Sequence, residues 1–193
     1  MATATNPAAL HFTGNDEADR LLASEPLALL IGFALDQQVP VQTAFAGPLK
    51  LKQRLGTLDA GAIATTDPAK LEAAFREKPA IHRFPGTMAQ RVQDLAAVIA
   101  DEYDGDAARV WREATDGADL RRRIESLPGF GKMKVIALGS VLAKRFGVKA
   151  AQELVPSHPT LGDVDSAEAL ADYQAKKRAY KSARRQAEAQ RQT

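Results

Sequence analysis

The sequence contains no cysteine among its 193 residues. This absence excludes disulfides, zinc–thiolate sites and iron–sulfur clusters, and a chain without disulfides is typical of a reducing compartment. The N-terminal residues combine neither a basic start nor an apolar run, and no window approaches the roughly 20 apolar residues of a membrane-spanning helix. We therefore expect a cytoplasmic protein without membrane contact.

Histidine is also scarce, and neither the histidines nor the acidic residues have the spacing of metal ligands. His11 and His158 lie in irregular terminal segments, far apart in the sequence. Asp101, Asp104 and Asp106 lack the spacing and the closing glutamate of a calcium loop. We therefore expect no metal at side-chain ligands, and we interpret these acidic residues as a helix end.

Runs of alternating β-branched residues are missing, and so are internal repeats. Apolar residues recur instead at helical spacing, most clearly over residues 87–103. With 45% hydrophobic residues, the chain is long enough for one large domain or two small subdomains. The expected fold class is all-α, with about nine short helices.

Charge is unevenly distributed, although the net charge is only +2. From residue 174 onward the chain has seven Lys and Arg residues and a single Glu, so this basic tail carries +6 and residues 1–173 carry −4. Basic terminal segments often bind nucleic acid through the release of counterions from phosphates. A solvated tail with helical propensity is the alternative interpretation.

The stretch SLPGFGKMKVIALGSVLAKRFG places two glycines between two amphipathic helices. Pro128 ends the first helix, Lys132 begins the second, and the glycines Gly129 and Gly131 lack Cβ atoms and can adopt positive φ. The free N–H groups and the positive dipole at the start of the second helix, beside Lys134, suit one phosphate. An ordinary turn between helices would also use a glycine, so both interpretations stay open.

Three stretches, in order, resemble landmarks of one protein family. A helix-hairpin-helix motif is resembled by LPGFGK. The family's central helix and its following turn are similar to LALLIGFALDQQVPVQTAFAG, and the next turn and helix are similar to AIHRFPGTMAQRVQDLAAVI. Together they cover residues 27–147 and resemble the helix-hairpin-helix (HhH-GPD) DNA glycosylase superfamily, most closely its alkyl-base branch. The resemblance implies that the hairpin glycines bring backbone N–H groups to a DNA phosphate.

The resemblance also implies two helical subdomains flanking a groove for DNA and a flipped base. Residues 1–26 would pack with the C-terminal helices, 27–127 would form the central helical subdomain, 118–147 the helix-hairpin-helix, 148–173 the C-terminal part of the second subdomain, and 174–193 the basic tail. Double-stranded DNA is the expected partner, and in a bacterium the protein would be nucleoid-associated. No protein partner is predicted.

Contacts with DNA are expected at the hairpin and at the turn after the central helix. Gln37 and Gln38 match the region that supplies the side chain filling the vacated base stack, with helix capping as the alternative. His82 lies on a turn near the groove and could contact a base or be an ordinary packed histidine. The residues predicted to contact DNA are Gly129, Phe130, Gly131, Lys132, Lys134, Gln37, Gln38 and His82.

One departure from the family pattern concerns the mechanism. In the branch that also cleaves the strand, a lysine two positions after the second hairpin glycine attacks the sugar, and here this position is Met133. The neighbouring lysines point elsewhere, because successive helix positions diverge by about 100°. Hydrolysis by water needs only a carboxylate. The candidates for that carboxylate, in order, are Asp163, Glu153 and Asp165. Capping of a nearby helix is the alternative role for Asp165.

The leading hypothesis is a base-excision repair enzyme, a monofunctional DNA N-glycosylase that removes a damaged base, with alkylated bases favoured by the resemblance. The alternatives are a noncatalytic protein that senses distorted DNA and a helical protein-interaction module. A carboxylate facing the groove near the hairpin favours the enzyme, and an apolar wall there favours the sensor. No cofactor is expected, and the one metal that the resemblance implies is a monovalent cation at the hairpin carbonyls. Which base is removed does not follow from the sequence, because pocket shape depends on scattered side chains.

Overall fold

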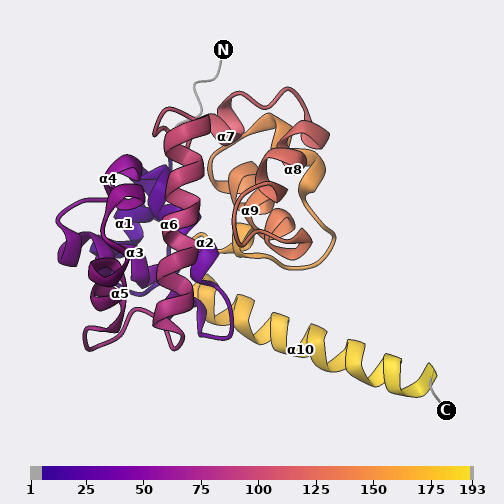
Figure 1. Cartoon of the computed structure of the whole chain (residues 1–193). Coiled ribbons are helices and arrows are strands. Elements are labelled where there is room, and N and C mark those ends of the chain that lie inside the picture. The colour runs from indigo at the N-terminus through magenta and orange to yellow at the C-terminus, as the bar shows by residue number, and fades with distance from the viewer. Residues whose placement is uncertain (1–5, 192–193) are drawn as a thin grey trace.

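The computed structural model describes residues 6–191, and within that range all regular structure is helical (Figure 1). This confirms the all-α fold class. In chain order the elements are α1 (Asp16–Ser24), α2 (Pro26–Leu35), α3 (Val41–Leu55), α4 (Ala60–Thr65), α5 (Pro68–Arg76), α6 (Pro85–Glu102), α7 (Arg109–Arg112), α8 (Gly117–Glu125), α9 (Lys132–Arg145), the 3-10 helices η1 (Lys149–Leu154) and η2 (Leu161–Asp163), and α10 (Ala167–Arg191).

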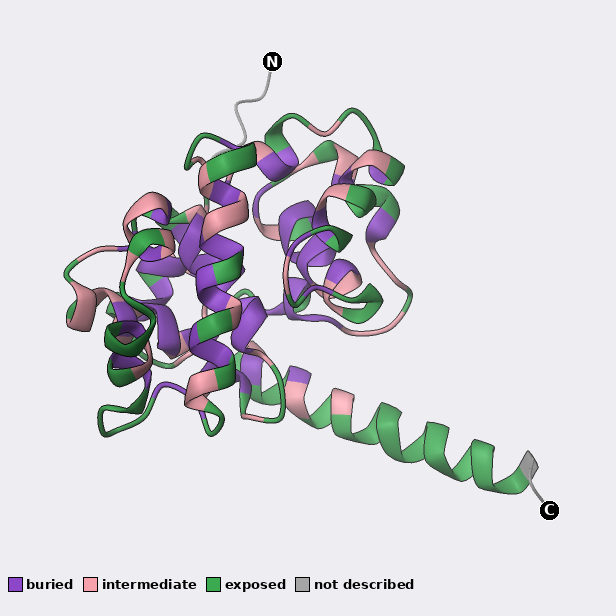
Figure 2. Ribbon diagram, viewed as in Figure 1, coloured by how far each residue is buried: buried purple, intermediate pink, exposed green. Residues whose placement is uncertain are grey.

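The first six helices pack together around α2, which contacts α1, α3 and α6. All of α2 after its first residue is buried (Figure 2). Phe45 of α3 meets the rings of Phe12 and Phe33 edge-on, with centroids 5.1 and 5.0 Å apart. A Cβ on Gly32 would lie 2.5 Å from the Phe45 ring, so this glycine permits the close approach of α2 and α3. The C-terminal end of α2 is thereby fixed in position.

The N-terminal helix α1 makes its main contacts with α2 and α3 rather than with the C-terminal helices, where the sequence analysis placed residues 1–26. The reason is the short connection, because Glu25 is at once the C-cap of α1 and the N-cap of α2. With no linker between them, α1 folds back onto its neighbours and its Leu22 joins their core. Residues 1–5 lie outside the described part of the chain.

Helices α8 and α9 form a second group with η1 and η2. Although α8 falls within residues 27–127, its packing partners are α7, α9 and η1, and none of the major contacts joins it to α2–α6. Two glycines let the last elements approach α9 closely: a Cβ on Gly139 would lie 2.7 Å from Leu154, and one on Gly162 would lie 2.5 Å from the Ser140 carbonyl oxygen. The hairpin helix α9 is thus enclosed on the side away from the first group.

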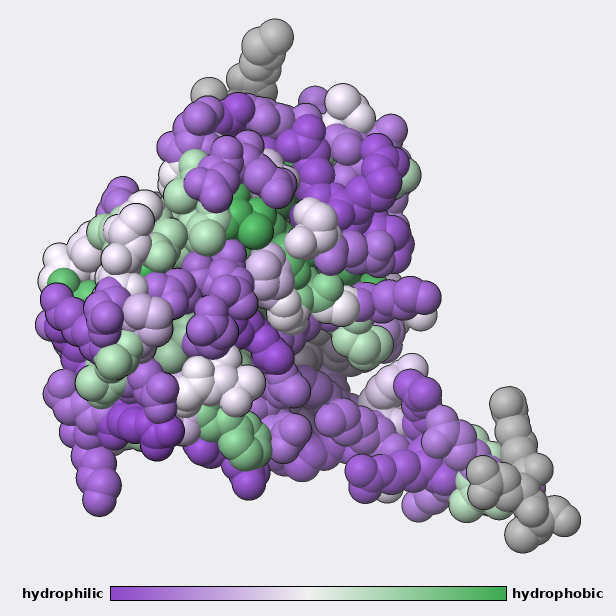
Figure 3. All heavy atoms as spheres, in the orientation of Figure 1, coloured by the Kyte–Doolittle hydropathy of each residue, from purple (hydrophilic) through white to green (hydrophobic). Residues whose placement is uncertain are grey.

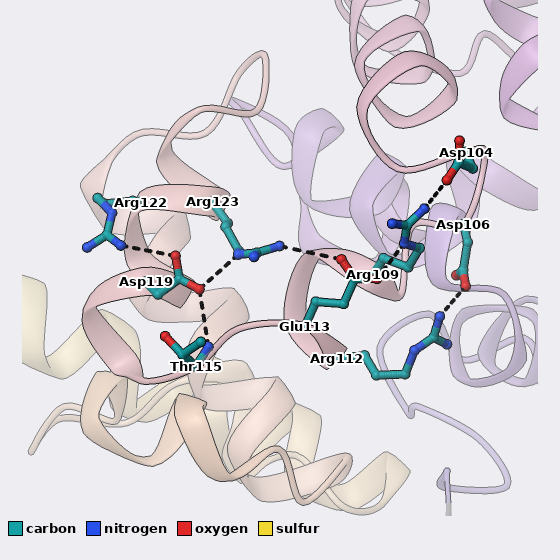
Figure 4. A network of polar contacts seen from close by, with 9 residues as sticks. All are labelled: Asp104, Asp106, Arg109, Arg112, Glu113, Thr115, Asp119, Arg122 and Arg123. Carbon is teal, nitrogen blue, oxygen red and sulfur yellow. Dashed lines mark hydrogen bonds and ion pairs between the residues drawn. The ribbon is translucent and has the colours of Figure 1, made fainter.

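A chain of ion pairs stabilises the connection from α6 to α8 (Figure 4). Arg109 pairs with Asp104 and Glu113, Arg112 with Asp106, and Arg123 with Asp119 and Glu113. Most of these groups are partly exposed, so each pair contributes little to stability by itself. Their main consequence here is electrostatic. The acidic loop after α6 is neutralised by arginines, in agreement with its interpretation as a helix end.

Helix α10 projects from the body of the protein (Figures 1 and 3). Its first turns are anchored by the buried side chains of Leu170 and Tyr173 and by a 3.0 Å hydrogen bond from Gln174 to Gln42 of α3. Residues 178–190 of the helix are all exposed. The basic tail is thus a continuation of α10. No helix within residues 6–191 has the length and hydropathy needed to cross a membrane.

Candidate functional site

The loop between α8 and α9 uses its two glycines for different purposes. Gly129 has φ +85°, a left-handed conformation that favours glycine, and a Cβ there would lie 2.5 Å from Arg91 of α6. Gly131 has φ −95°, which any residue adopts, so the expected positive φ occurs only at the first glycine. A Cβ on Gly131 would meet nothing within 4 Å. Gly129 therefore turns the chain, and Gly131 leaves the approach to α9 open.

The first turn of α9 presents unpaired donors to solvent. Within residues 6–191 the backbone N–H groups of Gly131, Lys132 and Met133 donate no hydrogen bond, and Gly131 caps the helix without a side chain. All three residues are exposed. Free N–H groups at the positive end of a helix dipole, with Lys132 beside them, form a site suited to a phosphate.

Phe130 and Lys134, both predicted to contact DNA, have internal roles as well. Phe130 is only 5% exposed and belongs to the core, because its position between the glycines turns its ring inward. The Lys134 ammonium lies 5.9 Å from the centre of that ring and donates a 3.1 Å hydrogen bond to the carbonyl oxygen of Ala34 on α2. Burial, together with the nearby positive charge of Arg91, lowers the pKa of Lys134 to about 8.

A cleft of about 320 Å³ lies beside the hairpin helix. Its size is at the lower end of the range for small-molecule sites. Segments far apart in the sequence enclose it: the end of α2, the first turns of α9, the segment before η2 and one face of α10. Its lining residues are Phe33, Asp36, Met133, Lys134, Ile136, Ala137, His158, Pro159, Thr160, Tyr173, Lys177, Tyr180, Lys181 and Arg184.

Aromatic and apolar side chains form much of the cleft wall. The rings of Tyr180 and His158 stack with centroids 5.4 Å apart and planes inclined by 13°. Met133 is 69% exposed and Tyr180 48%, which is unusual for large hydrophobic residues. Met133 occupies the position at which the strand-cleaving branch carries its lysine, and it faces this cleft. The cleft is thus adjacent both to the phosphate site and to the position from which chemistry on a sugar would be expected.

One carboxylate that the sequence analysis missed lines the cleft. Asp36 is the C-cap of α2, and its backbone N–H donates to the carbonyl oxygen of Phe33. Burial raises the pKa of Asp36, although nearby lysines act in the opposite direction. These lysines are Lys177, Lys134 and Lys181. The sequence signal was an acidic residue at the end of a wholly apolar helix, directly before the Gln-Gln pair.

The three predicted carboxylates do not line this cleft. Asp163 completes a capping box with Thr160 on η2 and pairs with Lys144. Burial acts to raise the pKa of Asp163, but the hydrogen bonds from Lys144 and Thr160 prevail and leave it below its ordinary value. Glu153 packs against Gly117 at the start of α8. Asp165 is exposed just before Ser166, whose side chain accepts a hydrogen bond from the backbone N–H of Ala169. Helix capping explains Asp163, and Ser166 takes the capping role considered for Asp165.

The turn after α2 is held by a buried histidine. His82 is 2% exposed, so it does not reach a base in this structure. Its Nδ1 accepts a hydrogen bond from the backbone N–H of Phe84, which leaves Nε2 to donate to the carbonyl oxygen of Gln37 at 3.0 Å. Arg91 donates to the Gln37 side chain at 2.5 Å. Burial lowers the pKa of His82, in keeping with a neutral ring. Gln37 and Gln38 are both exposed, and Gln38 has φ +57°.

Side chains suited to metal ions are not grouped in the described part of the chain. No set of three or more His, Asp or Glu residues there lies close enough to hold a metal ion. Backbone oxygens of the hairpin are available instead. The carbonyl groups of Ser126, Pro128 and Gly129 accept no hydrogen bond within residues 6–191.

Comparison with known protein families gives one match. Residues 31–188 match the family described as HhH-GPD superfamily base excision DNA repair protein. Neither the curated proteins nor the solved structures contain a match. The matched region covers most of the chain and includes the Gln-Gln turn, the hairpin, the cleft and nearly all of α10. The chain therefore belongs to the HhH-GPD superfamily of base excision DNA repair proteins, which bind DNA.

Proposed function

We propose that the protein is a monofunctional DNA N-glycosylase, which removes a damaged base and leaves the strand intact. The observation that carries this proposal is the position of Met133. It lies on the first turn of the hairpin helix, lines the cleft and has a side chain that cannot form an imine with a sugar. Contrary to the expectation that the lysines next to Met133 point elsewhere, Lys134 also lines the cleft, where its ammonium is held by the hydrogen bond to the Ala34 carbonyl oxygen. With no amine at position 133, this geometry supports attack by water.

In the proposed complex, the N–H groups at the start of α9 bind a phosphate of double-stranded DNA. One nucleotide rotates out of the duplex into the cleft, where Tyr180 and Met133 offer aromatic and apolar surface to the base. Rotation costs a few kcal/mol of stacking and pairing. Phosphate contacts at the hairpin and along α10 offset that cost.

The side chain that fills the vacated stack would come from the turn after α2. Gln38 is exposed at the tip of that turn in a left-handed conformation that costs a non-glycine residue about 1 kcal/mol. The hydrogen bond from His82 to Gln37 fixes the turn and supports this strained conformation. Phe84, 39% exposed at the start of α6, lies nearby, with its ring 5.9 Å from that of His82. We assign Gln38 as the wedge and His82 as a positioning residue.

A monovalent cation at the hairpin fits the residues present. The free carbonyl oxygens of Ser126, Pro128 and Gly129 are ligands of the type that such ions bind. These carbonyl groups would hold the cation and so stabilise the hairpin loop, and no chemical step depends on it.

A second candidate function is a noncatalytic sensor of distorted DNA. It is favoured by one observation, namely that Asp163, Glu153 and Asp165 all lie outside the cleft. A sensor would bind a damaged duplex through the same hairpin and accept the rotated base without releasing it.

A panel of damaged duplexes separates the two functions. The protein is incubated with duplexes that carry one alkylated, deaminated or oxidised base, and abasic products are then cleaved with alkali. The glycosylase proposal predicts alkali-dependent cleavage of at least one duplex above an undamaged control. Binding to damaged duplexes without any such cleavage would support the sensor and contradict the glycosylase.

A further inference from the structure

We propose that Asp36 is the carboxylate that stabilises the sugar cation and activates water in this cleft. The proposal rests on the glycosylase function given above. It assigns the acidic group to the end of α2, before the hairpin in the chain, whereas the sequence resemblance placed it after the hairpin.

The first support is position. Asp36 and Met133 line the same cleft, although they come from α2 and α9. The hydrogen bond from Lys134 to Ala34 holds the end of α2 against the first turn of α9. Asp36 is two residues beyond the Ala34 acceptor, so it is fixed in the same cleft as the position where the strand-cleaving branch carries its nucleophile.

The second support is availability. Within residues 6–191 the Asp36 side chain makes no hydrogen bond and no ion pair within 4 Å, and no other acidic residue lines the cleft. Asp163, in contrast, is engaged by Lys144 and by the backbone of Thr160. A carboxylate that already satisfies a cap would have to break that cap before it could serve a substrate. Asp36 can act without rearrangement.

The third support is the electrostatic setting. Burial favours the neutral carboxylic acid, whereas Lys134 of α9 and Lys177 and Lys181 of α10 favour the carboxylate. The lysines therefore keep a proton-accepting form available in an apolar cleft, where a charge acts more strongly than in water. A base with a pKa raised toward the working pH is also a better proton acceptor.

The reaction would proceed as follows. The bond between C1′ and the base nitrogen breaks, and its electron pair leaves on the base. The positive charge that develops on the sugar is stabilised by the Asp36 carboxylate. A water oxygen forms the new bond to C1′ and gives one proton to Asp36. That proton then passes through solvent to the released base, which restores the carboxylate.

A purely structural role for Asp36 is the competing explanation, in which its charge only attracts the lysines of α10. The two roles differ in their response to charge on the sugar. A carboxylate beside C1′ binds a cationic sugar analogue more tightly than a neutral one, because the cation resembles the transition state. A carboxylate that only anchors α10 does not distinguish the two analogues.

The test compares two duplexes that differ at one abasic position, a neutral tetrahydrofuran and a cationic pyrrolidine. We expect the wild-type protein to bind the pyrrolidine duplex at least about tenfold more tightly, a difference of about 1.4 kcal/mol. Asp36→Asn should bind both duplexes equally and keep its affinity for tetrahydrofuran. Asp101→Asn, an exposed acid at the far end of α6, should behave as wild type. Asp36→Glu, which retains the charge, should recover part of the preference, and circular dichroism checks the folding of each variant.

The inference would be overturned if folded Asp36→Asn kept the full preference for the pyrrolidine duplex. It would also be overturned if Asp163→Asn, and not Asp36→Asn, lost that preference. The damaged-base panel separates this failure from failure of the glycosylase proposal. Excision by wild type and by Asp36→Asn at equal rates would contradict only the role of Asp36. Absence of excision by wild type on every duplex would contradict both. Excision by wild type that falls at least about a hundredfold in Asp36→Asn would support both.

Discussion

The ammonium group of Lys134 lies 3.1 Å from the carbonyl oxygen of Ala34, and this hydrogen bond joins the hairpin helix to the end of the central helix. It connects two parts of the chain that are a hundred residues apart. The phosphate site at the start of α9 and the cleft beside Asp36 are therefore held in one arrangement. In the proposed complex, DNA bound at the hairpin has its rotated nucleotide next to the cleft.

The hairpin glycines should separate binding from stability. Gly131→Val should lower the free energy of unfolding by no more than about 1 kcal/mol, because its φ is ordinary, its Cβ meets no protein atom, and the cost is limited to a poorer N-cap. It should weaken DNA binding about 10- to 100-fold, since the side chain stands where hydrogen bonds to a phosphate would form. Gly61→Ala on α4 is the matched control. Equal dissociation constants for wild type and folded Gly131→Val would remove the hairpin from the DNA site.

The basic face of α10 should govern salt dependence. Lys177, Arg178, Lys181 and Arg185 make no ion pair within residues 6–191. Their joint replacement by glutamine should reduce the slope of log K against log salt by up to about 0.9 for each DNA phosphate that α10 no longer neutralises. Lys176→Gln is the control, because Lys176 is already paired with Asp172 at 2.7 Å. Identical slopes for the fourfold variant and wild type would identify α10 as a solvated appendage.

His82 should contribute to stability in a pH-dependent manner. His82→Leu leaves the Gln37 carbonyl and the Phe84 N–H without their partner, which costs about 1–3 kcal/mol. Because the pKa of His82 is lowered in the folded protein, the unfolded chain takes up a proton first as the pH falls below about 6.5. The difference in the free energy of unfolding between wild type and His82→Leu is thus fully present at neutral pH and shrinks in acid. Urea unfolding at several pH values measures this difference, and His11→Leu is the control. A difference that grows in acid would contradict this role of His82.

The pH profile of kcat/KM should have two limbs. Activity should rise with pH through the raised pKa of Asp36, because the carboxylate is the active form, and should fall above about pH 8 as Lys134 loses its proton. Other charged groups facing Asp36 are Lys177 and Lys181. Lys134→Arg should move the alkaline limb upward, because a guanidinium remains charged. An alkaline limb that stays in place in this variant would exclude Lys134 as its source.

Met133→Lys should create a strand-cleaving enzyme. The new amine would lie on an exposed position of the cleft, where it can form an imine with an abasic sugar. Borohydride should then trap a covalent complex between protein and abasic DNA. Met133→Arg, with a charge but no nucleophilic amine, should yield none, and neither should wild type. Trapping of wild type through Lys132 or Lys134 would refute attack by water.

The local features of this protein were predictable from the sequence, because they depend on neighbouring residues. The apolar periodicity, Pro128 and Gly129 were enough to predict an all-α fold and a hairpin. Burial was harder to predict. Phe130 and His82 stand within motifs that resemble DNA contacts, yet both side chains are buried and stabilise the loops that contain those motifs.

The cleft itself could not be predicted, because it exists only where α2, α9 and α10 meet. Counting along the chain from the hairpin led to Asp163, which the structure engages in a cap and an ion pair. Asp36 has no distinctive spacing to the hairpin. Its role follows from tertiary contacts, chiefly the hydrogen bond between Lys134 and Ala34, that join positions about a hundred residues apart.

One measurement tests the central claim most directly. Wild-type protein is incubated with a damaged duplex, and the same sample is divided between mass spectrometry for the free base and a denaturing gel without alkali. Excision by water predicts that free base accumulates while the strand stays full length, and that alkali then cleaves it at the abasic position. Absence of free base above a buffer control for every damaged duplex, or strand cleavage before alkali, would contradict the account.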